Sequence, residues 1–323
     1  MRSFRRVSVE IAASECWPLR TDFAFPDGSL FIVIQFLSIT RDPDYARRLW
    51  ALEGNTVFVD LERAGKAERQ AARSTVISAH TLDAAAGLAR LPNRGPLLVR
   101  TDPVEAGGDE QAARLAELGV DRVMLPMFRT RDEVDRLVEA LERAGEGRVK
   151  LSLLAETDDA VGALPEILAD QPPWLDHVHI GLNDLSLDRG TAFLFKPLAT
   201  GEIERLSEEV RDAGRRFGFG GVGLPGRGLV PAERILGEHV RVHSDVVILA
   251  RSFHQALDAT DPDALADGVA DLREWERRWR AAGDDTLEEN HRVVASAIRK
   301  VLQEKGETTP EDVSSAARRS GDG

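Results

Sequence analysis

Cysteine is almost absent from this 323-residue chain, which carries only Cys16 and therefore cannot form an intramolecular disulfide. The N-terminal residues MRSFRRVSVEIAASE lack the apolar stretch of a secretory signal. No apolar run approaches the ~18 residues that a membrane-spanning helix needs. These absences predict a cytoplasmic protein without a membrane segment.

Basic residues are fewer than acidic residues. The chain has 42 Lys and Arg residues and 55 Asp and Glu residues, which gives a net charge of −13. A nucleic acid or an anionic membrane surface would be repelled on average by such a chain. We therefore expect a small-molecule ligand rather than a nucleic-acid or membrane partner. Any anionic ligand would need a local cationic site.

Short runs rich in Val, Ile and Leu alternate with longer amphipathic segments, a rhythm typical of βα units. Most runs show no polar alternation, as expected of parallel strands that are buried on both faces. An open doubly wound sheet could hold them, but their even spacing favours closure into an α/β (β/α)8 TIM barrel. The eight runs are residues 31–39, 56–61, 96–100, 122–126, 150–155, 177–181, 217–222 and 245–250.

The predicted barrel domain, residues 30–282, has extensions at both ends. Residues 1–29 show no clear periodicity and are expected to form an N-terminal extension. Residues 283–305 are predicted to form a C-terminal helix, and the polar residues 306–323 a disordered tail. The helical segments at the C-terminal end of the chain exceed what a (β/α)8 barrel needs. We therefore expect these helices to pack between subunits of a homo-oligomer.

Polar residues at strand ends are the candidates for function, because barrel active sites form where strands end and βα loops begin. A single carboxylate at a strand end could simply cap the next helix, and Arg100 could be a structural ion-pair partner of Asp60 or Glu62. Taken together, the polar residues at the strand ends predict a functional site at one rim of the barrel. The residues are Asp60 and Glu62 after the second run, Arg100 after the third, Glu156 after the fifth and Asp184 after the sixth.

Glu156 and Asp184 follow consecutive predicted strands, so a barrel would place them as neighbours at its mouth. Two carboxylates with waters and substrate oxygens suit Mg²⁺ or Mn²⁺, whereas zinc would favour His or Cys ligands. Arg100 is a fixed cation that could clamp a carboxylate or stabilise a developing oxyanion.

Two glycine-containing segments could bind the anionic end of a substrate. Gly181 and Leu182 precede Asn183 in a strand-to-loop turn, where backbone N–H groups can approach a carboxylate. The segment GFGGVG at 218–223 matches a dinucleotide-binding pattern, but Pro225 follows where a helix should start, so we reject that interpretation. Arg227, in a Gly-rich loop after the seventh strand, could instead bind an anion.

The histidines offer no obvious catalytic base. His177 and His179 share one face of the sixth predicted strand and are expected to be structural, which leaves His80 as the reserve base. Lys66 could lie on an exposed helix face or reach over the rim to the substrate. A Ser/His/Asp or Cys/His nucleophile has no support, since GxSxG does not occur.

With these rim residues in this order, the sequence resembles the HpcH/HpaI aldolase/citrate lyase family. The resemblance covers roughly residues 50–255. Five motifs in register with the predicted strands are fairly specific. They are VFVDLE at 57–62, LVR at 98–100, GVD with MLP at 119–126, LAET at 154–157 and IGLNDLS at 180–186.

The resemblance implies a TIM barrel of the phosphoenolpyruvate/pyruvate superfamily. It further implies Glu156 and Asp184 as ligands of Mg²⁺ or Mn²⁺ and Arg100 as the arginine that stabilises an enolate. A substrate carboxylate would meet backbone amides near Gly181 and Asn183, and C-terminal helices would pack between subunits.

The chain also departs from the family pattern. The sugar-acid aldolases carry a histidine in the loop after strand two, where this sequence has none, and Arg63 interrupts the Asp-Leu-Glu-Asp motif of citrate-lyase-like members. These differences indicate a distinct subfamily whose proton-transfer residue would be Glu62, or His80 through water.

The leading hypothesis is a divalent-metal-dependent carbon–carbon lyase that cleaves or forms a 2-oxo acid through a pyruvate-type enolate. One alternative is a citrate-lyase-like acyl-CoA lyase or thioesterase, for which a CoA site would want basic residues on the rim. The other is a non-catalytic barrel that binds a small carboxylate.

Overall fold

Eight parallel strands close into a barrel in the computed structural model, which describes residues 22–24, 30–63, 80–145, 148–257, 261 and 263–307. Each strand pairs with the next in the chain, and β10 closes the ring by pairing with both β9 and β3. The predicted (β/α)8 TIM barrel is confirmed. Its strands are β3 (Gln35–Ile39), β4 (Asn55–Asp60), β5 (Leu97–Arg100), β6 (Arg122–Leu125), β7 (Lys150–Ala155), β8 (Leu175–Ile180), β9 (Arg216–Val222) and β10 (Val246–Leu249).

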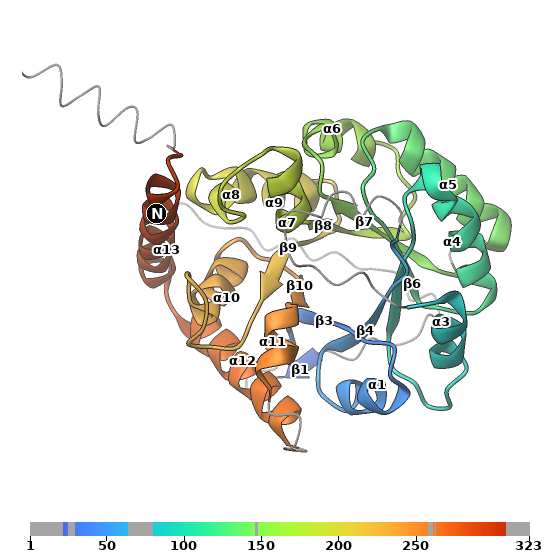
Figure 1. The fold of residues 1–323 in the computed structure, drawn as a ribbon, viewed down its shortest axis with the longest axis horizontal. Helices are drawn as coiled ribbons and strands as arrows, with labels where there is room; N and C mark the ends of the chain where they lie inside the picture. The colour runs from blue at the N-terminus through green and yellow to red at the C-terminus, as the bar shows by residue number, and fades with distance from the viewer. Residues whose placement is uncertain are drawn as a thin grey trace, which may run out of the picture. The chain divides into compact units, whose positions relative to one another are not determined.

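Helices surround this barrel and connect successive strands (Figure 1). Several begin at a side chain that accepts a backbone N–H of the first turn, namely Asp42 for α1, Thr81 for α3 and Thr157 for α6. The helices are α1 (Pro43–Trp50), α3 (Leu82–Ala89), α4 (Gly108–Glu117), α5 (Arg131–Gly145), α6 (Asp158–Leu168), α7 (Leu182–Asp188), α8 (Lys196–Ala199), α9 (Glu202–Asp212), α10 (Ala232–Arg241), α11 (Arg251–Ala256), α12 (Ala264–Ala281) and α13 (Asp284–Glu304), with a 3-10 turn η1 (Val104–Ala106).

The chain divides into two compact units, Met1–Val33 and Ile34–Gly323. In the first, β1 (Asp22–Ala24) and β2 (Leu30–Ile32) form an antiparallel pair. Most of the predicted extension 1–29, and residues 308–323 of the predicted tail, lie outside the described residues. None of the helices in the described ranges has the length and apolar character needed to span a bilayer.

Alternate residues of six barrel strands, β3 to β7 and β10, enter two separate hydrophobic cores. Phe58, Leu98 and Leu154 belong to a small cluster inside the barrel. Their neighbours in sequence, such as Val59 and Val99, belong to a larger cluster between the strands and helices. Side chains of a strand alternate between its two faces with a period of two. The residue two positions after each of these inner residues therefore also faces the barrel interior. This alternation brings Asp60, Arg100 and Glu156 to the carboxyl end of the barrel interior.

A histidine pair fills the barrel interior beside β9. His177 bonds to Ser152 Oγ, and His179 Nε2 bonds to the carbonyl oxygen of Gly220. A Cβ on Gly218 would lie 2.7 Å from His179 Nδ1, so this position has no room for a side chain. Burial, together with the nearby charge of Arg100, lowers the pKa of His179 to about 4, although the hydrogen bond to Gly220 acts in the opposite direction. Both histidines are buried.

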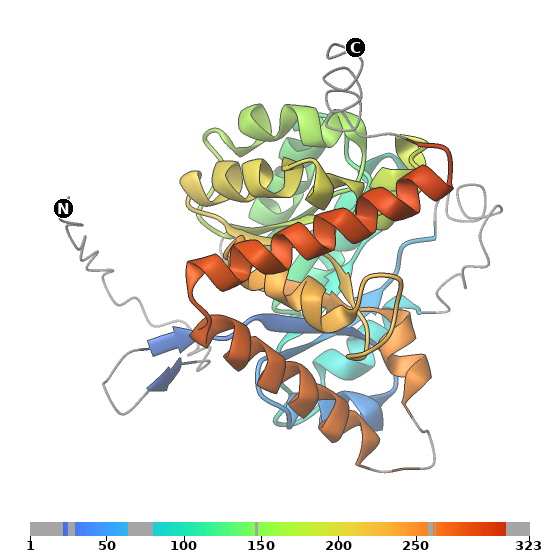
Figure 2. The same cartoon turned by 90° about the vertical axis from the view of Figure 1, so that its left-hand side faces the viewer.

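The C-terminal helices α12 and α13 lie against α10 on the outside of the barrel (Figure 2). Gly237 of α10 makes this approach possible, because a Cβ there would lie 2.9 Å from Trp279 Cε2 and 2.8 Å from Asn290 Nδ2. Both neighbours are fixed, since Trp279 donates to the carbonyl of Glu233 and Asn290 donates to that of Arg234. Oligomer formation through these helices stays a prediction.

Replacing Gly237 with Ala should therefore destabilise the protein. Overpacking costs about 1–3 kcal/mol, which exceeds the gain of about 1 kcal/mol that Ala brings to a helix. The matched control is Gly162→Ala in α6, where no described atom lies within 4 Å of the added Cβ and the same gain should be realised. Thermal unfolding should give a lower Tm for Gly237→Ala and a higher Tm for Gly162→Ala. Equal rises in both would refute this packing argument.

The buried His179 should also make stability depend on pH. Its pKa is about 4 in the folded protein and 6.5 ordinarily, so the unfolded chain takes up a proton first as the pH falls. Its contribution of about 3 kcal/mol is complete above pH ~6.5 and is lost as the pH falls toward ~4. Urea unfolding at several pH values should show a smaller slope of the unfolding free energy with pH in His179→Gln than in wild type. Identical slopes would contradict the assignment.

Candidate functional site

The predicted rim residues meet at the carboxyl end of the barrel. Asp60 and Arg100 are the last residues of β4 and β5, Glu156 follows β7, and Asp184 lies in the first turn of α7 after β8. All four line one cavity of about 760 Å³. The parallel barrel explains this meeting, because every strand ends at the same rim.

Arg100 forms a buried ion pair with two carboxylates. Its Nε and one terminal nitrogen each lie 2.9 Å from an oxygen of Asp60, and the same terminal nitrogen lies 3.1 Å from Glu62 Oε2. Burial alone would lower the pKa of Arg100, but the charges of Asp60 and Glu62 raise it well above its usual value. The arginine is therefore a permanent cation at the cavity wall, 9% exposed. The ion pair of Arg100 with Asp60 or Glu62, which the sequence suggested as one possible role of this arginine, is therefore present in the structure.

Glu156 and Asp184 do not serve as helix caps. Thr157 caps α6, and no side chain caps α7, so the simple capping interpretation fails for both carboxylates. Glu156 is 2% exposed and lies directly against Gly181, where a Cβ would be 2.7 Å from Glu156 Oε2. A glycine is thus required at position 181 to leave the carboxylate its place.

The donor set at this position fits a hard divalent cation. Glu156 and Asp184 supply oxygen ligands, and the cavity leaves space for waters and substrate oxygens, which Mg²⁺ and Mn²⁺ accept. Among the described residues, no group of three or more His, Cys, Asp or Glu side chains could hold a metal ion.

The candidates for proton transfer are placed differently from one another. His80 lines the cavity, and its Nδ1 accepts the backbone N–H of Asp60 at 3.0 Å, which puts the hydrogen of the neutral ring on Nε2. Glu62 is 1% exposed and contacts Arg100 without lining the cavity. Of the two, His80 is the one whose side chain lines the cavity.

The predicted substrate-binding residues lie at the same cavity, with one exception. Gly181, Leu182, Asn183 and Arg227 line it, whereas Lys66 lies outside the described residues. The first hydrogen bond of α7 runs from Leu185 N–H to the Gly181 carbonyl, so the N–H groups of Leu182 and Asn183 have no partner within the helix.

The GFGGVG segment has a packing role instead of forming a nucleotide loop. Residues 218–222 lie within β9 rather than in a strand-to-helix turn. Gly218 leaves space for the histidine pair, and Gly220, with φ +49°, lies against Leu182. The GxGxxG match is therefore explained by close contacts inside the barrel.

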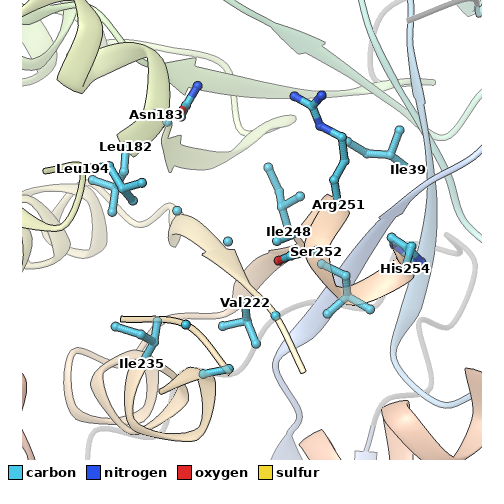
Figure 3. Close-up of a pocket in the computed structure, with 18 of the residues that line it drawn as sticks. Ile39, Leu182, Asn183, Leu194, Val222, Ile235, Ile248, Arg251, Ser252 and His254 are labelled. Atoms are coloured by element: carbon cyan, nitrogen blue, oxygen red, sulfur yellow. The ribbon is translucent and has the colours of Figure 1, made fainter. Parts of the chain in front are cut away.

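Two arginines at the cavity were missed by the sequence analysis. Arg41 follows β3 and Arg251 follows β10, and both line the cavity. Each lies two residues beyond the last residue of its strand, so a search for charged residues at the start of every βα segment would have found both. In Figure 3 the Arg251 side chain extends from α11 toward the side of the pocket where Asn183 lies.

Comparisons with known proteins agree with this architecture. The HpcH/HpaI aldolase/citrate lyase family matches residues 35–220, more than half of the chain. No curated protein sequence matches this chain.

Three solved structures have a similar fold. An HpcH/HpaI aldolase from Desulfitobacterium hafniense DCB-2 superposes with a TM-score of 0.52 at 16% identity, covering 78% of this chain and 95% of that one. The citrate synthase SbnG gives 0.51 at 18%, covering 75% and 93%. RipC from Yersinia pestis gives 0.50 at 16%, covering 79% and 98%. At these identities the likeness shows the fold alone.

The family match begins at the first residue of β3 and ends within β9, so it includes Asp60, Arg100, Glu156 and Gly181. The family's name describes lyases, which supports a lyase-type function in general terms. The chain belongs to the HpcH/HpaI aldolase/citrate lyase family.

Proposed function

We propose that this protein is a divalent-metal-dependent carbon–carbon lyase, an aldolase that cleaves or forms a 2-oxo acid through a pyruvate-type enolate. The observation that carries the proposal is the placement of a permanent cation, Arg100, on the same cavity wall as the buried carboxylate of Glu156. Membership of a lyase family supports the same class of reaction.

Glu156 and Asp184 would hold the Mg²⁺ or Mn²⁺ ion at the carboxyl ends of β7 and β8. When bound, the ion supplies Lewis-acid polarisation of the 2-oxo group and neutralises negative charge on the substrate. The N–H groups of Leu182 and Asn183 would bind the substrate carboxylate, because they precede the first hydrogen bond of α7.

Arg100 would stabilise the negative charge that develops on the 2-oxo oxygen. In the cleavage direction, the C4 hydroxyl loses its proton, the C3–C4 bond breaks, and its electron pair forms the enolate of pyruvate, which is then protonated at C3. Asp60 and Glu62 hold the guanidinium in one position, so no side-chain reorganisation is needed as this charge forms.

The proton of the C4 hydroxyl would pass to His80 or Glu62. His80 lines the cavity and is therefore the better placed of the two, acting through water. The substrate would be a small 2-oxo acid or a related carboxylate.

A second candidate function has one observation in its favour. Besides Arg100, the cavity of about 760 Å³ carries Arg41, Arg227 and Arg251, which an acyl-CoA lyase or thioesterase could use to bind the phosphates of CoA. Binding of acetyl-CoA to the metal-loaded protein would favour this function over the aldolase.

The most direct test is exchange of the pyruvate methyl protons for deuterium in D2O with Mg²⁺, followed by proton NMR. Exchange requires enolate formation but no aldehyde. We expect metal-dependent exchange in wild type, a loss of about 100-fold or more in Glu156→Gln, and a loss of about 100-fold in Arg100→Lys, because the forked donor is gone. Arg100→Lys keeps the charge that Asp60 and Glu62 need for folding.

The matched controls are Arg143→Lys on α5, whose side chain is 70% exposed, and Glu117→Gln, which is exposed on α4. Both should exchange pyruvate protons at the wild-type rate. If wild type shows no exchange above the metal alone, the aldolase proposal is wrong. Equal rates in wild type and Glu156→Gln would remove Glu156 from the mechanism.

A further inference from the structure

The helix α13 ends in a short segment that turns back toward the barrel. Gly306 has a φ of +78°, and its N–H donates to the Gln303 carbonyl, while the N–H of Glu307 donates to the Leu302 carbonyl. A left-handed glycine with two such hydrogen bonds is a common way to end a helix and redirect the chain. We call residues 305–307 the C-terminal strap. They leave α13 on the side of the barrel where this helix lies against α8 (Figure 1).

The C-terminal strap holds both backbone polar groups of Ala192, which lies in the α7–α8 loop, residues 189–195. Glu307 Oε2 accepts the Ala192 N–H at 2.6 Å, and Lys305 Nζ donates to the Ala192 carbonyl at 2.9 Å. The other carboxylate oxygen of Glu307 pairs with Lys196 at the start of α8. Burial alone would raise the pKa of Glu307, but the bonds to Lys196 and Ala192 lower it below its usual value, so the carboxylate stays charged.

The α7–α8 loop forms part of the wall of the large cavity. Leu194 and Phe195 line this cavity, and Figure 3 shows Leu194 beside Leu182 of α7. A second hollow of about 90 Å³ lies between α7, the loop and α8, where Leu185 and Leu194 are among its lining residues. Atoms that border a void lose packing contacts on that side. Packing against α7 therefore does not fix the loop by itself, and its position depends on bonds from other segments.

Hydrogen bonds lead from the α7–α8 loop into α7. The N–H of Thr191, the neighbour of Ala192, donates to the Ser186 carbonyl at 2.8 Å. Ser186 is 4% exposed, and its hydroxyl donates to the Asn183 carbonyl at 2.7 Å. The N–H of Asn183 is one of the two groups to which the proposed function assigns the substrate carboxylate. A displacement of Ala192 would therefore be passed on to the carboxylate-binding end of α7.

We propose that the C-terminal strap positions the α7–α8 loop and, through it, the amides at the start of α7 that bind the substrate carboxylate. Lys305 and Glu307 are then positioning residues, which act through Ala192 and are not among the described residues that line the cavity. This inference rests on the proposed function. It adds a dependence of substrate binding on a carboxylate that lies 115 positions away from Ala192 in the sequence.

The test compares wild type, Glu307→Ala and Glu307→Gln in two measurements. In amide hydrogen exchange followed by mass spectrometry, peptides covering residues 189–196 should exchange at least about tenfold faster in Glu307→Ala, because the Ala192 N–H loses its acceptor. In deuterium exchange of the pyruvate methyl group with Mg²⁺, the KM for pyruvate should rise about three- to tenfold in Glu307→Ala, the range of one hydrogen bond. Its kcat should stay within about twofold of wild type, because Arg100 and Glu156 are untouched.

Glu307→Gln keeps an acceptor for the Ala192 N–H, so its KM should lie between those of wild type and Glu307→Ala. The matched control is Glu304→Ala, at an exposed position of the last turn of α13, which should equal wild type in both measurements. Unchanged amide exchange in Glu307→Ala overturns the strap. Faster amide exchange with an unchanged KM, or a fall in kcat alone, overturns its role in substrate binding. Absence of pyruvate proton exchange in wild type would instead overturn the proposed function, and amide exchange would still decide whether the strap holds the loop.

Discussion

The electrostatics of the barrel mouth depend on the ion pair of Arg100 with Asp60 and Glu62. Three charged groups are buried together at the ends of β4 and β5, where removal of one partner would cost about 3–5 kcal/mol. Arg100 offsets only one of the two negative charges of Asp60 and Glu62, and Glu156 and Asp184 add two further carboxylates at the mouth. A divalent cation would offset most of the negative charge that remains.

The position of each group follows from strand alternation rather than from its loop. Phe58 and Asp60, Leu98 and Arg100, and Leu154 and Glu156 are pairs separated by two residues, and the first member of each pair lies in the inner core. A slip of one residue in any strand would turn the functional side chain toward the surrounding helices. The inner apolar layer thus fixes the site as well as the fold.

Much of this arrangement could be predicted from the sequence. The eight apolar runs overlap the eight strands, and the rule that polar residues collect at strand ends located Asp60, Arg100, Glu156 and Asp184 at one cavity. These features depend on local pattern and on the parallel topology. A sequence can show both.

Other features depend on contacts between segments that are distant in the chain. The sequence left open whether Arg100 pairs with Asp60 or Glu62, and the structure shows that it contacts both. The reason for Gly218 and Gly181 became visible only when His179 and Glu156 were found against them. Arg251 follows the eighth predicted run, 245–250, but the approach of its side chain to the cavity depends on the packing of distant segments.

The central claim is that Glu156 and Asp184 together hold one divalent cation. Electron paramagnetic resonance of Mn²⁺, titrated with the protein in the presence of oxalate as a planar mimic of the pyruvate enolate, measures this binding directly. The account predicts one Mn²⁺ per chain, with affinity about tenfold or more weaker in both Glu156→Gln and Asp184→Asn and unchanged in the Glu117→Gln control. Wild-type affinity in either of the first two variants would contradict it.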